Sequence, residues 1–164
     1  MKPPGRSILV VAIIALLGLM GGIVYYASLD NDDLSSATIK MGDVELVDVN
    51  SIENRATLKV SFLVKNNGDV TVTVPVITFE LFADGSVIGN GTYSTEDVAM
   101  PGRAAFYPDA EIPLNTRMTI AMSEMNEGVY NKIVSGQQVQ YSATGMMTVE
   151  SAWSIVELDF DTNS

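Results

Sequence analysis

The feature that most constrains this chain is an apolar run over residues 8–27, which contains no charged side chain. As a helix it would span about 30 Å, the thickness of the hydrocarbon core of a bilayer, and it would satisfy its own backbone hydrogen bonds. Lys2 and Arg6 precede the run, and every acidic residue follows it. Because a short basic flank stays in the cytoplasm, the sequence predicts a cytoplasmic tail (1–7), one transmembrane helix (8–27) and an extracytoplasmic remainder.

A cleaved signal peptide is the alternative to a retained anchor. Its apolar core would normally have about 7–15 residues and end in a small-x-small cleavage site. The run here is longer, and Tyr25-Tyr26-Ala27 places a bulky ring where a small residue is needed. We therefore favour the anchor, whose two tyrosines would lie at the level of the lipid headgroups.

Three glycines occupy the second half of the run: Gly18, Gly21 and Gly22. Gly18 and Gly22 form a GxxxG pair, a spacing that lets two membrane helices approach closely. We expect these glycines to be candidate helix-packing residues. The alternative is that they reflect the general abundance of small residues in membrane helices.

The rest of the chain is acidic and lacks two residue types that many active sites use. The net charge of the whole chain is −11, although Lys2 and Arg6 lie before the apolar run, and the chain has no cysteine and no histidine. Such a surface repels nucleic acid and anionic headgroups. Without these two side chains a thiolate metal site and the commonest general base are both excluded. We therefore expect a non-enzymatic protein without cofactor, metal or small-molecule substrate.

Two acidic stretches need separate interpretation. Residues 30–33 carry oxygen ligands of the kind that Ca²⁺ prefers, but they lack the alternate spacing and central glycine of a calcium loop. We expect a solvated linker over 28–38 that holds the domain off the membrane. Glu157, Asp159 and Asp161 alternate along a predicted strand, so they should share one solvated face.

Residues 39–164 have mostly the pattern of β-strands. The clearest segment is 57–65, in which apolar side chains alternate regularly with polar ones. The alternation over 41–50 slips near Val47, which indicates a bulge. Pro75 interrupts the next strand and has no N–H to donate, so it should lie at a sheet edge or a bulge.

Further strands are expected over 86–94, 103–114, 138–149 and 154–160, with turns at 66–69, 83–86 and 100–102. Over 115–135, methionine and β-branched residues recur at intervals of three or four, which predicts a helix ending before Gly136. The part before Ser123 could still be strand. We expect the methionines of this segment to fill the core, and Trp153 to plug it rather than serve as an exposed anchor. These elements predict an all-β fold: a single fibronectin- or immunoglobulin-like β-sandwich with one helix.

Four short motifs recur in one known family: Val64-Lys65-Asn66-Asn67, Ile77-Thr78-Phe79-Glu80-Leu81, Gly85-Ser86-Val87-Ile88-Gly89-Asn90-Gly91 and Tyr141-Ser142-Ala143-Thr144-Gly145. Over about 39–160 the chain resembles the late-embryogenesis-abundant type-2 family, also called the water-stress and hypersensitive-response domain. The family's Asn-Pro-Tyr turn is Asn66-Asn67-Gly68 here, so the chain would be a divergent member. The resemblance implies a β-sandwich with one helix, no known catalytic residues, a link to stress tolerance and frequent anchoring by one helix.

Asn90-Gly91-Thr92 fits the acceptor pattern for N-glycosylation and lies near a predicted hairpin tip, although Asn-Gly is also ordinary turn chemistry. Taken together, we expect a single-pass cell-membrane protein that contacts lipid through its helix. Its outer domain would bind or assemble with a membrane or surface protein, as a stress-related module or an accessory subunit of a membrane complex. The alternative is an archaellin- or pilin-like filament subunit, processed near Gly5-Arg6-Ser7.

Overall fold

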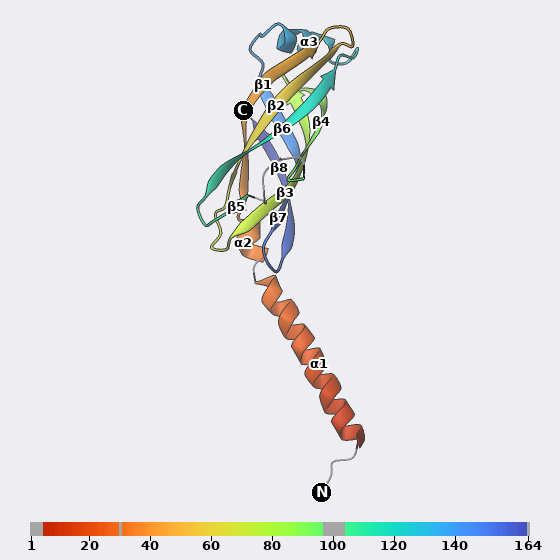
Figure 1. Cartoon of the computed structure of the whole chain (residues 1–164), viewed down its shortest axis with the longest axis vertical. Helices are drawn as coiled ribbons and strands as arrows, with labels where there is room; N and C mark the ends of the chain where they lie inside the picture. Colours follow the sequence, from red (N-terminus) through yellow and green to blue (C-terminus); the bar gives the residue numbers. More distant parts are fainter. Residues whose placement is uncertain (1–4, 30, 97–103, 164) are drawn as a thin grey trace.

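The computed structural model describes residues 5–29, 31–96 and 104–163. It shows a long N-terminal helix attached to one end of a two-sheet β-sandwich (Figure 1). Helix α1 spans Gly5–Ser28 and contains the apolar run. Residues 1–4 of the predicted tail, Asp30 and the turn predicted at 100–102 lie outside the described residues.

Eight strands and two short helices make up the described part of the domain. They are α2 (Asn31–Ser35), β1 (Thr38–Asn50), β2 (Arg55–Lys65), β3 (Val72–Ala83), β4 (Ser86–Ser94), β5 (Ala105–Phe106), β6 (Glu111–Ala121), α3 (Glu127–Val134), β7 (Tyr141–Glu150) and β8 (Ile155–Asn163). One sheet has the order β1-β2-β6, and the other has the order β4-β3-β7-β8 with β5 paired to β3. The fold is thus the predicted all-β sandwich preceded by one apolar helix.

The core lies between the two sheets, and β2 shows why the chain folds this way. Its alternate residues are buried from Ala56 to Val64, as the period-2 pattern predicts. Phe62 is at the centre, with its ring edge-on to Phe79 at 4.8 Å and to Phe160 at 5.8 Å between centroids. The three rings join both sheets in one hydrophobic core.

Glycines beside Phe79 explain two of the family-like motifs. In the register of the second sheet, Phe79 lies between Gly91 of β4 and Gly145 of β7. A Cβ atom at Gly91 would lie 2.3 Å from the ring of Phe79, and one at Gly145 would lie 2.1 Å from the carbonyl oxygen of Thr78. Only glycine leaves room for this ring and its backbone.

The predicted irregularities of the strands are confirmed. The register of β1 on β2 shifts between Leu46 and Asp48, which places a bulge at Val47. The register of β3 on β7 shifts between Thr73 and Val76, so Pro75 lies at an irregularity where no ladder donor is required.

Two predictions over the middle of the chain are wrong in part. The strand expected over 103–114 is two strands, because the chain passes from β5 in one sheet to β6 in the other. The helix expected over 115–135 begins only at Glu127, whereas residues 115–121 belong to β6, in agreement with the alternative that the part before Ser123 is strand. Of the methionines assigned to the core, Met118 is buried whereas Met125 is 94% exposed. Gly136 does end the helix, with a φ of 71°.

Candidate functional site: the helix-proximal end of the sandwich

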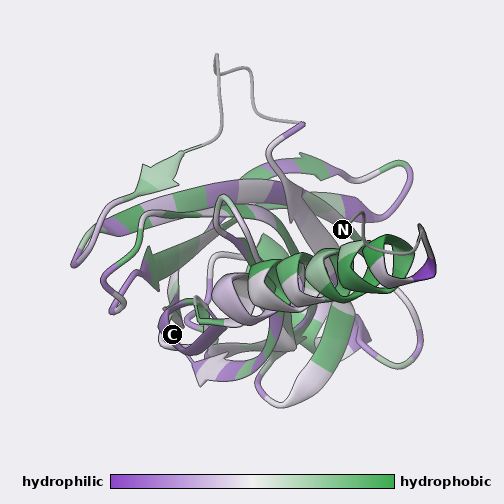
Figure 2. Ribbon diagram, turned by 90° about the horizontal axis from the view of Figure 1, so that it is seen from below, coloured by the Kyte–Doolittle hydropathy of each residue, from purple (hydrophilic) through white to green (hydrophobic). Residues whose placement is uncertain are grey.

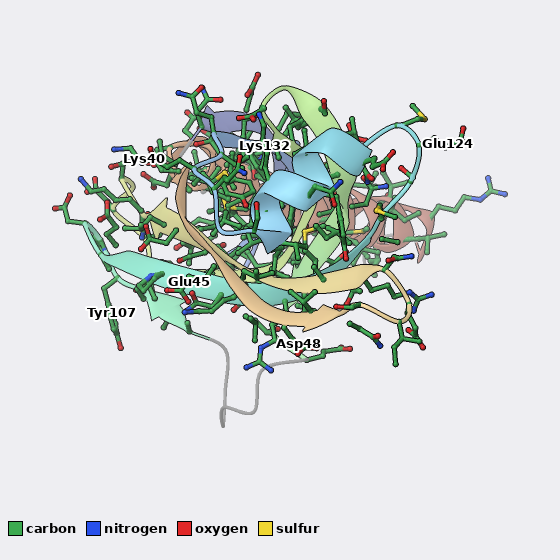
Figure 3. The ribbon with its side chains drawn as sticks, turned by 90° about the horizontal axis from the view of Figure 1, so that it is seen from above. Lys40, Glu45, Asp48, Tyr107, Glu124 and Lys132 are labelled. Carbon is green, nitrogen blue, oxygen red and sulfur yellow. The ribbon has the colours of Figure 1, made fainter. Side chains whose placement is uncertain are left out.

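Four segments distant in the sequence meet where the sandwich joins α1. Register places Thr38 opposite Lys65 and Lys65 opposite Glu111 in one sheet, and Val72 opposite Phe106 in the other. We therefore define the helix-proximal end as α2 with the loop 66–71, the turn 107–110 and the turn 151–154 (Figure 1). The far end carries the 51–54 and 84–85 turns and α3, as seen from above in Figure 3.

Helix α2 occupies the segment that was predicted to be a solvated linker, so that prediction is wrong. Leu34 is completely buried in the sandwich core. The Asn67 side chain donates a hydrogen bond of 2.9 Å to the carbonyl oxygen of Ser36, and the backbone N–H of Asp69 donates to Asp33 Oδ1 at 3.3 Å. The sequence pattern missed this because a single leucine among acidic residues carries no periodic signal.

Asn66 holds the loop 66–71 together from inside. Its side chain is fully buried and donates to the carbonyl oxygens of Val70 at 2.8 Å and Phe106 at 3.0 Å. Its Oδ1 accepts from the N–H of Gly68 at 3.0 Å. A turn was predicted here, but the sequence did not show that its first asparagine would also connect it to β5.

The turn between β7 and β8 is tightly closed and presents apolar side chains outward. Ser151 Oγ accepts hydrogen bonds from the N–H groups of Trp153 at 3.2 Å and Ser154 at 3.1 Å. Trp153 is 66% exposed and Ile155 is 65% exposed. The preferred expectation that Trp153 plugs the core is therefore wrong: the side chain is exposed, and its role as an anchor for a partner stays a prediction. Ser154 Oγ also hydrogen-bonds to Asn31 Oδ1, which joins this turn to α2.

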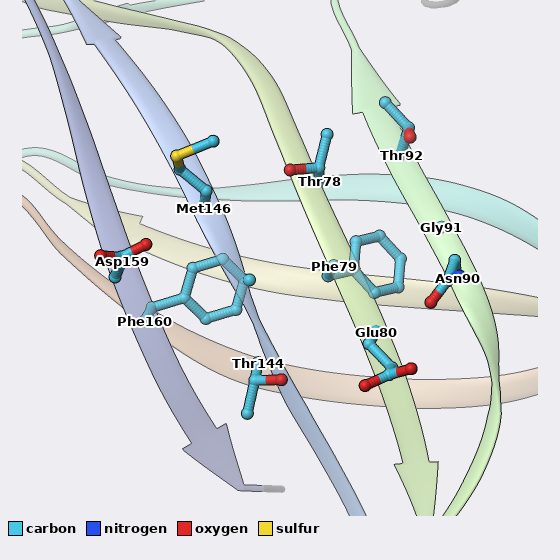
Figure 4. Close-up of a pocket in the computed structure, with 11 residues that line it drawn as sticks. Thr78, Phe79, Glu80, Asn90, Gly91, Thr92, Thr144, Met146, Asp159 and Phe160 are labelled. Atoms are coloured by element: carbon cyan, nitrogen blue, oxygen red, sulfur yellow. The ribbon is translucent and has the colours of Figure 1, made fainter.

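A shallow groove of about 630 Å³ crosses the outer face of the second sheet and is the main alternative site (Figure 4). Glu80 of β3 and Asp159 of β8 supply its carboxylates, and threonines line much of the rest. Asn90 lies on this face, exposed on the edge strand β4 rather than at a hairpin tip as predicted. Glycosylation of Asn90 stays a prediction.

The acidic residues of the described segments do not form a metal-binding cluster. No three of them come together as metal ligands. Glu157, Asp159 and Asp161 lie on one exposed face of β8, as predicted. In the groove the register places Glu80 beside Thr144 and Asp159 beside Met146, so the two carboxylates are not cross-strand partners. The groove offers hydrogen-bonding side chains.

Helix α1 makes no packing contact with the sandwich that would cover its apolar surface. It is long and apolar enough to span a membrane, and its hydrophobic residues are green in Figure 2. The most apolar part of the helix is not buried in the structure. A Cβ atom added at Gly18, Gly21 or Gly22 would have no neighbour within 4 Å. The three glycines are thus open to another helix or to lipid, and their packing role stays a prediction.

An ion pair between Lys132 and Asp84 lies at the far end, and among the ion pairs of the described residues it is the one that shifts a pKa. Lys132 of α3 donates to Asp84 Oδ2 at 2.7 Å, and the N–H of Gln140 donates to Asp84 Oδ1 at 3.1 Å. These hydrogen bonds lower the pKa of Asp84 below 3.8. Burial, together with the charge of Asp84, raises the pKa of Tyr141 above 10.0.

The comparisons with known proteins concern the fold. No family model and no curated protein matches the sequence. A protein of Arabidopsis thaliana has a similar solution structure, with 14% identity, a TM-score of 0.51 and coverage of 77% of this chain and 79% of that chain. The X-ray structure of a structural genomics target has 8% identity, a TM-score of 0.50 and coverage of 78% and 84%.

A third solved structure belongs to a protein provisionally assigned to the late embryogenesis abundant class. It has 10% identity, a TM-score of 0.45 and coverage of 96% of this chain and 88% of that chain. The TM-scores of 0.51 and 0.50 indicate a shared fold, and at identities this low they indicate nothing further, because one fold serves many functions. The chain is thus similar in fold to an Arabidopsis protein, and its membership of a family stays a prediction.

Proposed function

We propose that this chain is a membrane-anchored, non-enzymatic binding module of the late-embryogenesis-abundant type-2 kind, with α1 in the bilayer and the sandwich outside the cytoplasm. The observation that carries the proposal is the contrast between α1 and the domain. The sandwich completes its core without α1, whereas the apolar surface of α1 is uncovered. A helix with apolar residues on all sides is stable in lipid or in the interior of a larger protein.

The far end supports a binding role for the domain. Ile52 is 95% exposed and Met125 is 94% exposed. The hydrogen bond of 2.9 Å from the N–H of Met122 to the carbonyl oxygen of Asn54 holds their two loops together. A membrane or surface protein that meets the domain from outside would contact these side chains. The described residues provide no observation that favours the filament alternative.

Orientation can be measured with single cysteines, since the native chain contains none. Ser7→Cys lies before the apolar run, and Met125→Cys lies on an exposed loop. In intact cells, a membrane-impermeant maleimide should label the Met125→Cys variant, and it should label the Ser7→Cys variant only after lysis. Mass spectrometry should find residues 8–27 in the mature protein. Loss of these residues would identify a signal peptide and contradict the anchor.

The binding role is tested by crosslinking in native membranes, with a photoreactive residue at position 52 or 125. A matched probe at Glu157, on the exposed face of β8, is the control. Adducts with one neighbouring protein from positions 52 and 125, but not from 157, are expected. Recovery of the chain alone at monomer mass from all three positions would contradict a protein partner.

A further inference from the structure

The geometry points to a second membrane contact: Trp153 of the β7–β8 turn and Ile155, the first residue of β8, insert into the headgroup layer of the bilayer that holds α1. The proposed ligand is a lipid surface of zwitterionic phospholipid. This inference rests on the proposed function, because it requires α1 to be in the membrane. It adds a specific orientation, in which the sandwich rests on the bilayer instead of standing away from it.

The first step of the inference is the short distance along the chain between α1 and the segment that contacts the β7–β8 turn. Helix α1 ends at Ser28, and Asn31 is hydrogen-bonded to Ser154 of the β7–β8 turn. Three residues span at most about 10 Å when fully extended. Whatever the tilt of α1, the turn therefore lies close to the point where the chain leaves the hydrocarbon. The headgroup layer is itself about 5–8 Å deep on each side.

The rigidity of the turn carries the second step. Glu150 and Ile155 are register partners, and Ser151 closes the turn with the hydrogen bonds described above. The buried Leu34 fixes α2 to the same end of the sandwich. The indole and the isoleucine side chain are thus held outward near the membrane, so insertion orders few additional groups.

The chemistry of the two side chains carries the third step. Tryptophan is enriched where an apolar environment meets water, because its ring is apolar and its N–H needs a hydrogen-bond partner. Moving both side chains from water into the interface removes apolar surface from water. Asp32, Asp33 and Asp69 lie at the same end, and their negative charges oppose binding to anionic lipid. The expected surface is therefore zwitterionic.

The test uses Trp153 as its own probe, since it is the single tryptophan of the chain. The full chain is reconstituted in phosphatidylcholine vesicles, and flotation reports anchoring separately. The emission of Trp153 should shift to shorter wavelength, and lipid brominated near the headgroup should reduce it about two-fold, as expected for a ring at the interface. Vesicles containing phosphatidylglycerol should give weaker quenching.

The matched control moves the tryptophan to the far end in a Trp153→Phe, Ile52→Trp double variant. Position 52 also lies in a turn and its side chain is exposed. A tryptophan there should emit like indole in water, and brominated lipid should not quench it. If the chain floats but Trp153 behaves like the control, the lipid contact is wrong and the anchor stands. If Trp153 is shielded only in native membranes, a protein covers it and the inference is again wrong. If the chain does not float, both proposals fail.

Discussion

The two ends of the sandwich are built differently. At the helix-proximal end, a short helix, two turns and a loop are joined through the buried side chains of Leu34 and Asn66. At the far end, α3 closes the sandwich with the buried side chains of Tyr130 and Ile133, and an exposed ion pair links it to the β3–β4 turn. The difference is that the helix-proximal end holds the segment after α1 in the folded domain, since Leu34 of α2 lies in the core, whereas the ion pair at the far end lies on the surface.

Leu34→Ala should break this contrast most strongly. Removing a fully buried leucine side chain should lower the free energy of unfolding by about 3 kcal/mol, because the transfer energy is lost and a cavity remains. Ile52→Ala at the far end removes a side chain that is 95% exposed and should change little. Chemical denaturation of both variants in detergent measures the difference. Equal, small effects would mean that α2 is not docked.

Asn66→Ala should have the next largest effect. It removes the donor to two carbonyl oxygens and the acceptor for the N–H of Gly68, which should cost about 2 kcal/mol. Asn67→Ala removes hydrogen bonds in an exposed setting and should cost less than half as much. Thermal unfolding compares the two variants, and a reversed order would contradict the assignment of Asn66 as the residue that holds the loop together.

A pair of glycine substitutions should change stability in opposite directions at the two ends. At Gly68 a Cβ atom would lie 2.7 Å from the carbonyl oxygen of Asp33, so Gly68→Ala should cost about 1.5 kcal/mol by forcing α2 and the loop apart. At Gly128 of α3 a Cβ atom would meet open space. Gly128→Ala should therefore stabilise the protein by about 0.5–1 kcal/mol through helix propensity. Stabilisation by both changes would contradict close packing of α2.

Asp84→Asn should have the smallest effect and a defined pH dependence. The pKa of Asp84 is lowered in the folded state by Lys132 and Gln140. Its stabilising effect is therefore present above the unfolded pKa of 3.8 and is lost as the pH falls through the lower folded value. The native protein should melt slightly above the variant near pH 7, and the two melting temperatures should converge in strong acid. A constant difference at all pH values would exclude ionisation as the cause.

How much of the molecule could be predicted depends on how regular its local patterns are. The β2 strand and the bulge at Val47 follow from the alternation of side chains, which is a local property. The single strand expected over 103–114 is two strands because β5 and β6 belong to different sheets, and sequence spacing does not report a change of sheet. Of the candidate site, the sequence identified Trp153 and Asn66 as turn residues. It did not predict that Trp153 is exposed or that Asn66 is buried.

The apolar run by itself determined that this chain has a helix suited to lipid, because length and the absence of charge are properties of consecutive residues. Alternation likewise determined that the remainder forms strands. Only the tertiary structure decided that Leu34 joins the core and that Trp153 faces outward. Burial depends on which distant segments meet, and here four separate segments meet near the C-terminal end of α1.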